Sequence, residues 1–296
     1  MTKDFEIRGA YPAIVTPFTK DARDIDYRSL KRLIEHVLSG GSTGLVVCGS
    51  TGEAATLSDN EYRAVLEFVV AEARNFNDKK VIAGVGSSST SRSVEMAEFA
   101  KGVGVDNVLV VTPPYNKPSQ AGIAEHMRSV SDIFGSPVIA YNVPSRTGGN
   151  LLPATAVALA KEGVICAIKE SSGSFDQMMD LRAQGGDILK VVSGEDSLVY
   201  AALAIGAIGT ISVTANVLPN KISEMVELAL AGDFERACAI QFETLPLTRA
   251  LFLESNPIPV KAALEHLGII QDSSVRLPLI QASSSTKSEI KRILAR

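Results

Sequence analysis

The stretch Val164-Ile-Cys-Ala-Ile168 is apolar on both faces and is followed directly by two charged residues, Lys169 and Glu170. A strand buried on one face alternates apolar and polar residues, whereas a parallel strand covered by helices on both sides is a continuous apolar run. This stretch is therefore typical of a buried parallel strand in an α/β protein. The charged pair marks the point at which that strand ends.

Seven further runs of the same kind occur along the chain, at residues 11–15, 44–48, 81–85, 107–111, 137–141, 189–193 and 207–213. Amphipathic segments separate the runs. One begins after Asp26, a suitable N-cap, and another after Ser58-Asp-Asn-Glu61, which is a capping box. Further helices are expected at residues 91–103, 119–134, 153–161, 175–183, 196–205 and 218–230.

Eight consecutive strand–helix units of this kind predict an α/β protein with a (β/α)8 TIM barrel. A doubly wound sheet is the alternative, but regular units without a crossover insertion favour a closed barrel. We expect the barrel to occupy residues 1–232. Residues 233–296 carry no strand pattern, and helices are expected there at 234–253, 259–267 and 286–294. This C-terminal part is predicted to be a small helical appendage.

Composition excludes several classes of protein. The formal net charge is −4, which argues against a dedicated nucleic-acid surface. The most apolar stretch, residues 198–211, is shorter than the roughly 20 residues that span a bilayer. The N-terminus has no apolar run and does not resemble a secretory signal. Three scattered cysteines, Cys48, Cys166 and Cys238, predict core thiols in a reducing compartment, and so a cytoplasmic protein.

A metal site is not expected. The only histidines, His36, His126 and His266, all lie in predicted helices and far apart in the sequence. None follows a strand, where a catalytic metal of a barrel would be held. We expect each histidine at the surface or at its boundary. Glu195 and Asp196, which follow the seventh strand, are interpreted as a helix cap rather than as ligands.

In a barrel of this type the active site lies at the carboxyl ends of the strands. Lys169 is one such residue, and burial after an apolar strand would favour its neutral amine, which attacks ketones to form imines. The alternative is a structural lysine that pairs with Glu170 or faces water at the barrel mouth. Tyr141 ends the neighbouring strand, where its phenol could transfer protons, although a packed tyrosine is the simpler interpretation.

Other strand ends supply groups for anionic substrates. Ser50 and Thr51 lie in a glycine-flanked turn whose hydroxyl and backbone N–H groups suit a small carboxylate. Arg146 follows the fifth strand and could hold a second carboxylate by a bidentate contact. A solvated loop arginine is the alternative.

Five motifs together resemble the family of 4-hydroxy-tetrahydrodipicolinate (dihydrodipicolinate) synthases. This family belongs to the pyruvate-dependent aldolases, with N-acetylneuraminate lyase. Two motifs are shared across that superfamily, Gly49-Ser-Thr-Gly-Glu53 and Ile168-Lys-Glu170. Three are typical of the synthase branch: Tyr141-Asn-Val-Pro-Ser-Arg-Thr-Gly148, Ile211-Ser-Val-Thr-Ala-Asn216 and Asn256-Pro-Ile-Pro-Val-Lys261. The resemblance covers essentially the whole chain.

The resemblance implies condensation of pyruvate with L-aspartate-4-semialdehyde, the first committed step of the diaminopimelate route to lysine. Lys169 would form the Schiff base with pyruvate, and Tyr141 would donate and accept protons. Ser50, in place of the threonine of many members, and Tyr115 would complete a hydroxyl relay. Tyr115 would come from the neighbouring subunit of a tight dimer, with two dimers forming a homotetramer. No cofactor is implied, because the lysine itself supplies the electron sink.

The resemblance also implies the residues that bind substrate. Thr51 and the main chain of Ile211 would hold pyruvate, and Arg146 would hold the carboxylate of the semialdehyde. A sister lyase acting on a 2-oxo sugar acid is one alternative, which Arg146 disfavours because it suits a small acidic aldehyde. A non-catalytic metabolite-binding barrel is another, and the complete set of Lys169, Tyr141, Ser50 and Tyr115 argues against it.

The resemblance bears on regulation as well. Lysine inhibits some members at the dimer interface, where acidic and polar side chains bind its amino groups. This chain has Arg92 where inhibited members place a glutamate, and Pro114 where many have a tyrosine. Ala54 also lacks a hydrogen-bonding side chain, and Asp59 is the one acid left there to attract lysine. Because like charges repel in a partly enclosed site, we expect weak or absent inhibition by lysine.

Overall fold

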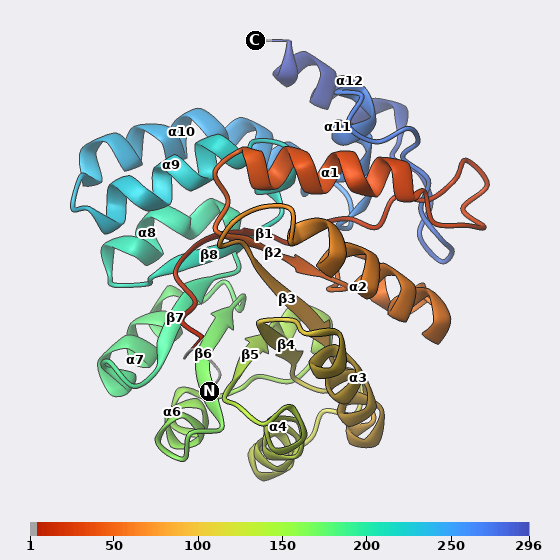
Figure 1. The fold of residues 1–296 in the computed structure, drawn as a ribbon. Helices are drawn as coiled ribbons and strands as arrows, with labels where there is room; N and C mark the ends of the chain where they lie inside the picture. The colour runs from red at the N-terminus through yellow and green to blue at the C-terminus, as the bar shows by residue number, and fades with distance from the viewer. Residues whose placement is uncertain (1–4, 296) are drawn as a thin grey trace. The chain divides into compact units, whose positions relative to one another are not determined.

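The computed structural model describes residues 5–295. It confirms the predicted fold class, because its eight strands alternate with helices along the chain (Figure 1). The strands are β1 (Gly9–Pro12), β2 (Gly44–Val47), β3 (Lys80–Val85), β4 (Asn107–Val111), β5 (Val138–Asn142), β6 (Ile165–Glu170), β7 (Lys190–Ser193) and β8 (Gly209–Ser212).

The strands form one sheet in the order β1-β8-β7-β6-β5-β4-β3-β2. Consecutive strands from β3 to β8 pair in parallel. The two strands at the ends of this order also meet, because Ala13 and Val46 form a parallel bridge and the Ile14 N–H donates to the Val46 carbonyl at 2.9 Å. A parallel sheet whose first and second strands join in this way is a (β/α)8 barrel.

The helices follow the predicted pattern with small shifts at their ends. They are α1 (Tyr27–Ser39), α2 (Asp59–Ala73), α3 (Thr90–Val103), α4 (Gln120–Phe134), α5 (Pro144–Thr147), α6 (Pro153–Lys161), α7 (Phe175–Gly185), α8 (Val199–Ala204), α9 (Pro219–Leu230), α10 (Phe234–Ala250), α11 (Ile258–His266) and α12 (Ser284–Leu294). No helix within residues 5–295 is long and apolar enough to cross a bilayer.

Three elements differ more strongly from the sequence-based expectation. Strand β1 was expected at residues 11–15 but spans Gly9–Pro12, and beyond it the pairing continues only as the single bridge between Ala13 and Val46. The helix expected at 196–205 is a 3₁₀ turn, Asp196–Leu198, followed by the shorter α8. Helix α5 was not expected, because four residues opened by a proline carry no apolar periodicity.

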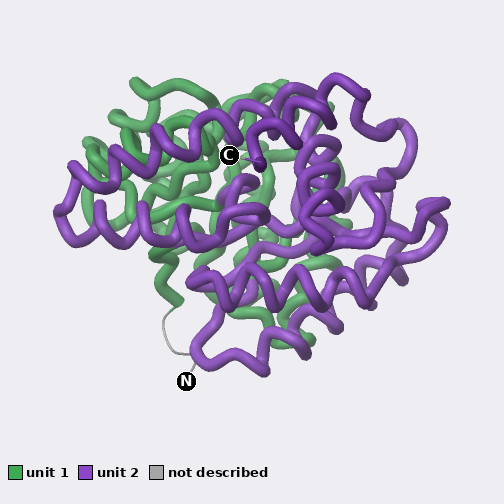
Figure 2. The backbone as a smooth tube through the Cα atoms, turned by 90° about the horizontal axis from the view of Figure 1, so that it is seen from above, with its two compact units in different colours: residues 1–9, 82–211 green, residues 10–81, 212–296 purple. Residues whose placement is uncertain are grey.

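The described chain separates into two compact units, shown in green and purple in Figure 2. One comprises residues 1–9 and 82–211, and contains β4 to β7 with the helices that follow them. The other comprises residues 10–81 and 212–296, and contains β2, α1, α2 and the helices α9 to α12. The division into a barrel of residues 1–232 and an appendage of residues 233–296 stays a prediction.

Both expected N-caps are confirmed. The Asp26 carboxylate accepts hydrogen bonds from the N–H groups of Arg28 and Ser29 at the start of α1. At the start of α2 the Ser58 hydroxyl and the Glu61 carboxylate form the reciprocal capping box. Glu61 also accepts two hydrogen bonds from the Arg276 guanidinium, at 2.8 and 2.5 Å. These contacts lower the pKa of Glu61 from 4.5 to about 2.

The low pKa of Glu61 predicts a pH-dependent contribution to stability. Because the folded pKa lies below the unfolded value, the contribution is complete above about pH 4.5 and is lost as the pH falls toward 2. Replacing Glu61 by glutamine should lower the free energy of unfolding at pH 7 by about 1 kcal/mol, a modest value because the pair is partly solvated. The loss should shrink in acid. Chemical denaturation across this pH range measures it, with Glu67→Gln on the exposed face of α2 as the control. An equal loss at pH 7 and pH 2 would contradict the assignment.

Candidate active site

Lys169 and Tyr141 are direct neighbours on adjacent strands. Strands β5 and β6 are neighbours in the sheet (Figure 1). Lys169 lies in β6 and Tyr141 in β5, and the register of the two strands sets their Cα atoms opposite each other. The lysine Nζ lies 4.1 Å from the centroid of the tyrosine ring. Both side chains are buried, with 7% and 8% of their surface exposed. The prediction that the two residues are strand neighbours is confirmed.

Glu170 is not the partner of Lys169, because consecutive residues of a strand point to opposite faces. Its carboxylate is instead buried among neutral donors. It accepts hydrogen bonds from the Asn142 and Gln177 side-chain amides at 3.1 and 3.0 Å, and from the Ser172 N–H at 2.6 Å. Asn150 extends the network, since its side-chain oxygen accepts from the amides of Asn142 and Gln177 and its amide nitrogen donates to the Gln177 oxygen.

This network fixes the register that brings the site together. Asn142 faces Glu170 across the β5–β6 pair, one residue beyond Tyr141 and Lys169. A shift of one residue would separate both pairs and would turn each side chain to the wrong face. Asn142 and Glu170 were not among the site residues expected from the sequence. The signal available was their position, each directly after a candidate site residue at the end of an apolar strand.

Strand β7 leaves room for the lysine. The Gly194 N–H donates to the Glu170 carbonyl at 2.8 Å, which extends the β6–β7 pairing. A Cβ atom at Gly194 would lie 2.7 Å from the Lys169 Cε and would collide with the Ser171 hydroxyl. The lysine side chain therefore passes close to a backbone position that only glycine can occupy without displacing it.

Glu195 is a second titratable group near Lys169. Burial, followed by the charge of Asp196, raises the pKa of Glu195 to about 7, and the opposing charge of Lys169 limits the rise. Glu195 was expected to belong to a helix cap. It does occupy the N-cap position of the 3₁₀ turn Asp196–Leu198, but its side chain makes no capping hydrogen bond. A glutamate that changes charge near neutral pH is a candidate for a functional role.

Tyr115 and Arg146 lie in the segments that follow β4 and β5. Tyr115 has a left-handed backbone conformation, with φ of 70°, and its side chain is 91% exposed. Its N–H donates to the carbonyl of Thr147, the last residue of α5, at 3.2 Å, which joins the two segments. Arg146 is exposed as well, and it lies in α5 rather than in the loop expected from the sequence. Ile211, the last residue of this unit, is buried in β8.

Ser50 and Thr51 belong to the other compact unit, in the turn Gly49–Glu53 that follows β2. Ser50 is exposed, whereas Thr51 is buried and its hydroxyl oxygen accepts a hydrogen bond from the Asn256 amide at 2.9 Å. Glu53 ends the turn with φ of 52° and forms a buried ion pair with Lys261. The relay that would join Ser50, Tyr141 and Tyr115 stays a prediction.

Potential metal and thiol chemistry is limited in the described part of the chain. Within residues 5–295 no three histidine, cysteine, aspartate or glutamate side chains are grouped so that they could hold a metal ion. His126 is buried beside the Thr90 hydroxyl, 3.0 Å from its Nδ1, so the expectation that it lies at the surface or boundary is wrong. Burial raises the pKa of Cys48, and that of Cys166 to about 11, which favours unreactive thiols.

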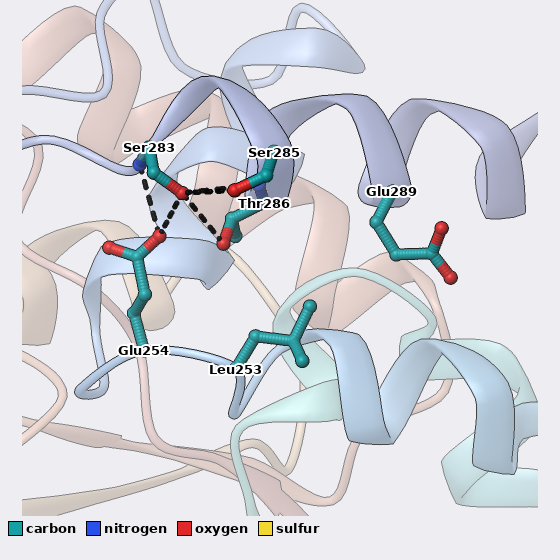
Figure 3. Close-up of a pocket in the computed structure, with 6 residues that line it drawn as sticks. All are labelled: Leu253, Glu254, Ser283, Ser285, Thr286 and Glu289. Carbon is teal, nitrogen blue, oxygen red and sulfur yellow. Dashed lines mark hydrogen bonds between the residues drawn. The ribbon is translucent and has the colours of Figure 1, made fainter.

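A pocket near the start of α12 contains none of the predicted site residues. Its lining consists of Leu253, Glu254, Ser283, Ser285, Thr286 and Glu289 (Figure 3). The polar groups at its edge already satisfy one another. The Glu254 carboxylate accepts from the Ser283 N–H and hydroxyl at 3.0 and 2.8 Å, and the Ser283 hydroxyl also caps α12. We interpret these contacts as a helix N-cap.

Comparison with known proteins agrees with the geometry. Residues 6–296 match the model of the dihydrodipicolinate synthetase family. The 4-hydroxy-tetrahydrodipicolinate synthase of Geobacter metallireducens is 42% identical over 97% of each chain, and that of Methanopyrus kandleri is 45% identical over 98% of this chain and 96% of its own. The chloride-inhibited dihydrodipicolinate synthase of Acinetobacter baumannii, solved with pyruvate, is 38% identical and superposes with a TM-score of 0.94 over 98% of each chain. The chain therefore belongs to the dihydrodipicolinate synthetase family.

Proposed function

We propose that Lys169 of this chain forms a Schiff base with pyruvate, and that the resulting enamine attacks L-aspartate-4-semialdehyde to give 4-hydroxy-tetrahydrodipicolinate. The reaction itself is that of the family, a lyase-type condensation in the diaminopimelate route to lysine. The observation that carries the assignment to Lys169 is its buried amine, set 4.1 Å from the Tyr141 ring by the β5–β6 register.

Lys169 is the one residue that would bond covalently to the substrate. The neutral amine adds to the ketone of pyruvate, and loss of water leaves an iminium ion. The iminium carbon acts as an electron sink, so a methyl proton leaves and an enamine forms. The enamine carbon attacks the aldehyde, whose oxygen takes up a proton and becomes the 4-hydroxyl group. The substrate's own amine then displaces Lys169 by transimination, which closes the ring and frees the enzyme.

Tyr141 is proposed as the group that moves the protons, because its side chain packs against the amine that each step involves. Ser50 and Tyr115 would relay protons between Tyr141 and water. Thr51 and the main chain of Ile211 would bind the pyruvate carboxylate, and Arg146 the carboxylate of the semialdehyde. The Acinetobacter relative solved with pyruvate supports a pyruvate site in a chain of this fold. No cofactor enters these steps.

The first prediction concerns the imine. Borohydride added with pyruvate should inactivate the enzyme and add the mass of a reduced pyruvate adduct to the peptide that contains Lys169, as read by mass spectrometry. Lys169→Ala should abolish the adduct while the far-ultraviolet circular dichroism spectrum is unchanged. Lys190→Ala, at the start of β7, is the matched control and should leave labelling intact. An adduct on any other lysine would refute the assignment.

The assembly proposed is a homotetramer of two tight dimers, in a cytoplasmic enzyme whose catalytic barrel is residues 1–232 and whose appendage is residues 233–296. The exposure of the Tyr115 ring supports this assembly, because a large aromatic side chain left 91% exposed in one chain suits a contact with another. One solved relative, 35% identical, is described as a monomeric variant.

The second prediction therefore concerns assembly. Sedimentation velocity at assay concentration should show a tetramer or a dimer. Replacing Tyr115 by phenylalanine removes the hydroxyl but keeps the ring, so it should lower kcat by about tenfold or more while the sedimentation coefficient is unchanged. A fully active monomer would show that Tyr115 is not needed from a second subunit.

The third prediction concerns inhibition by lysine, with which one solved relative, that of Cyanidioschyzon merolae, was crystallised. The Arg92 guanidinium lies at the surface of α3, 3.1 Å from the Glu95 carboxylate. An exposed pair of this kind leaves most of the repulsion toward a lysine ammonium in place. Activity at saturating pyruvate should therefore change little up to millimolar lysine, and Arg92→Glu should increase the sensitivity. Cooperative inhibition of the unmodified enzyme at sub-millimolar lysine would contradict this expectation.

A further inference from the structure

We propose that Asn256 and Lys261 are positioning residues that hold the turn Gly49–Glu53 in the conformation in which Thr51 binds the substrate carboxylate. The inference rests on the proposed function, because it takes Thr51 to be a pyruvate-binding residue. All the contacts that carry it lie within the unit formed by residues 10–81 and 212–296. Asn256 and Lys261 flank the first turn of α11, and each contacts a different residue of the turn.

The first contact orients the Thr51 hydroxyl. The Asn256 amide nitrogen donates to the hydroxyl oxygen at 2.9 Å, and both residues are buried. A hydroxyl has one proton to donate and two lone pairs to accept with. Because Asn256 occupies one lone pair as a donor, the hydroxyl proton stays available for another acceptor. An incoming carboxylate is such an acceptor, so the contact prepares Thr51 for an anionic ligand.

The second contact fixes the end of the turn. The Lys261 ammonium is fully buried and forms an ion pair with the Glu53 carboxylate. It also donates to the Ser274 carbonyl at 2.9 Å and lies 4.1 Å from the centroid of the Phe18 ring. The other Glu53 oxygen accepts the Arg276 N–H at 3.0 Å. Both oxygens of the glutamate are therefore held by residues of the C-terminal segment.

This fixation matters because Glu53 has a left-handed backbone conformation, with φ of 52°, which non-glycine residues seldom adopt. A residue keeps such a conformation only when the surrounding contacts determine it. A second brace acts on the same turn, since the Thr16 hydroxyl donates to the Gly52 carbonyl at 2.7 Å. The turn therefore has its binding conformation before the substrate arrives. This preorganisation lowers the entropic cost of ordering the turn when the substrate binds.

The burial of the ion pair indicates how specific the arrangement is. Two charges removed from water gain little net stability over an apolar pair, whereas loss of one partner leaves an uncompensated buried charge. Burial lowers the pKa of Lys261 to about 8 even though Glu53 opposes the change. The ion pair therefore joins α11 to the turn at a large desolvation cost. Its directional contacts fix the position of Glu53 and, through Glu53, that of Thr51.

The test separates positioning from stability. Asn256→Ala should raise the KM for pyruvate about tenfold, because it removes one hydrogen bond that orients the carboxylate-binding Thr51 hydroxyl. The kcat should change less than twofold. The melting temperature reports stability independently. Asn220→Ala, at an exposed position in α9, is the matched asparagine control and should leave the KM unchanged.

A double-mutant cycle tests whether Asn256 acts through Thr51. Thr51→Val should raise the KM by itself, and adding Asn256→Ala should raise it little further, because the two changes remove the same interaction. For Lys261, the isosteric Lys261→Met should lower the melting temperature and raise the KM. The pair Glu53→Gln with Lys261→Met should recover melting temperature, since no buried charge is left alone, but should not restore the KM.

Two results would overturn the inference. One is a folded Asn256→Ala enzyme with an unchanged KM for pyruvate. The other is a KM of the Thr51→Val, Asn256→Ala double variant that is raised by the full product of the two single effects. Failure of the unmodified chain to form a borohydride adduct with pyruvate would instead overturn the proposed function and, with it, the role assigned to Thr51. The labelling experiment and the KM series therefore distinguish the two failures.

Discussion

The hydrogen-bonded register between β5 and β6 is the constraint on which the proposed catalytic pair, Lys169 and Tyr141, depends. It sets Tyr141 opposite Lys169 on one face of the sheet, and Asn142 opposite Glu170 on the other. The first pair can do chemistry, because an amine and a phenol lie within contact of each other. The second pair holds position, because amide donors fix the buried Glu170 carboxylate in place. One register thus places the proposed catalytic pair on one face and, on the other, the hydrogen-bonded pair that holds the two strands in position.

Buried charges in this protein are accommodated by two different means. The Glu170 carboxylate is stabilised by hydrogen bonds from three neutral donors rather than by a cation. Glu53 is paired with Lys261, and the lysine is further satisfied by a carbonyl and an aromatic ring. Either solution offsets the loss of hydration only when its geometry is kept. Both clusters lie directly beside candidate functional residues, which is where a rigid arrangement contributes most to catalysis.

The sequence was sufficient for the features that depend on local pattern. Continuous apolar runs, without the alternation of a half-exposed strand, predicted the parallel strands. Asp26 and Ser58 predicted the starts of two helices, because an N-cap acts over three or four residues. Lys169 and Tyr141 could be expected on neighbouring strands, because consecutive strands of a barrel are usually adjacent. The family resemblance supplied roles for residues such as Tyr115 and Arg146, whose surroundings no local pattern describes.

The rest depends on contacts between distant residues. Asn256 and Thr51 are 205 positions apart, so nothing in either neighbourhood indicates their hydrogen bond. Glu195 resembled a helix cap because it precedes a helical turn, and only its packing shows that burial and Asp196 govern its pKa. His126 lies in an amphipathic helix, and the helical pattern alone did not show that its face is buried.

The most direct measurement of the proposed chemistry is the exchange of the pyruvate methyl protons with solvent, followed by proton NMR in heavy water without the aldehyde. An enamine formed on Lys169, with Tyr141 moving the proton, predicts that the unmodified enzyme replaces these protons by deuterium at a rate well above that of free pyruvate. Lys169→Ala should abolish the exchange, and Tyr141→Phe should slow it by about a hundredfold or more. Undiminished exchange in the Lys169→Ala enzyme would contradict the assignment of the Schiff base to this lysine.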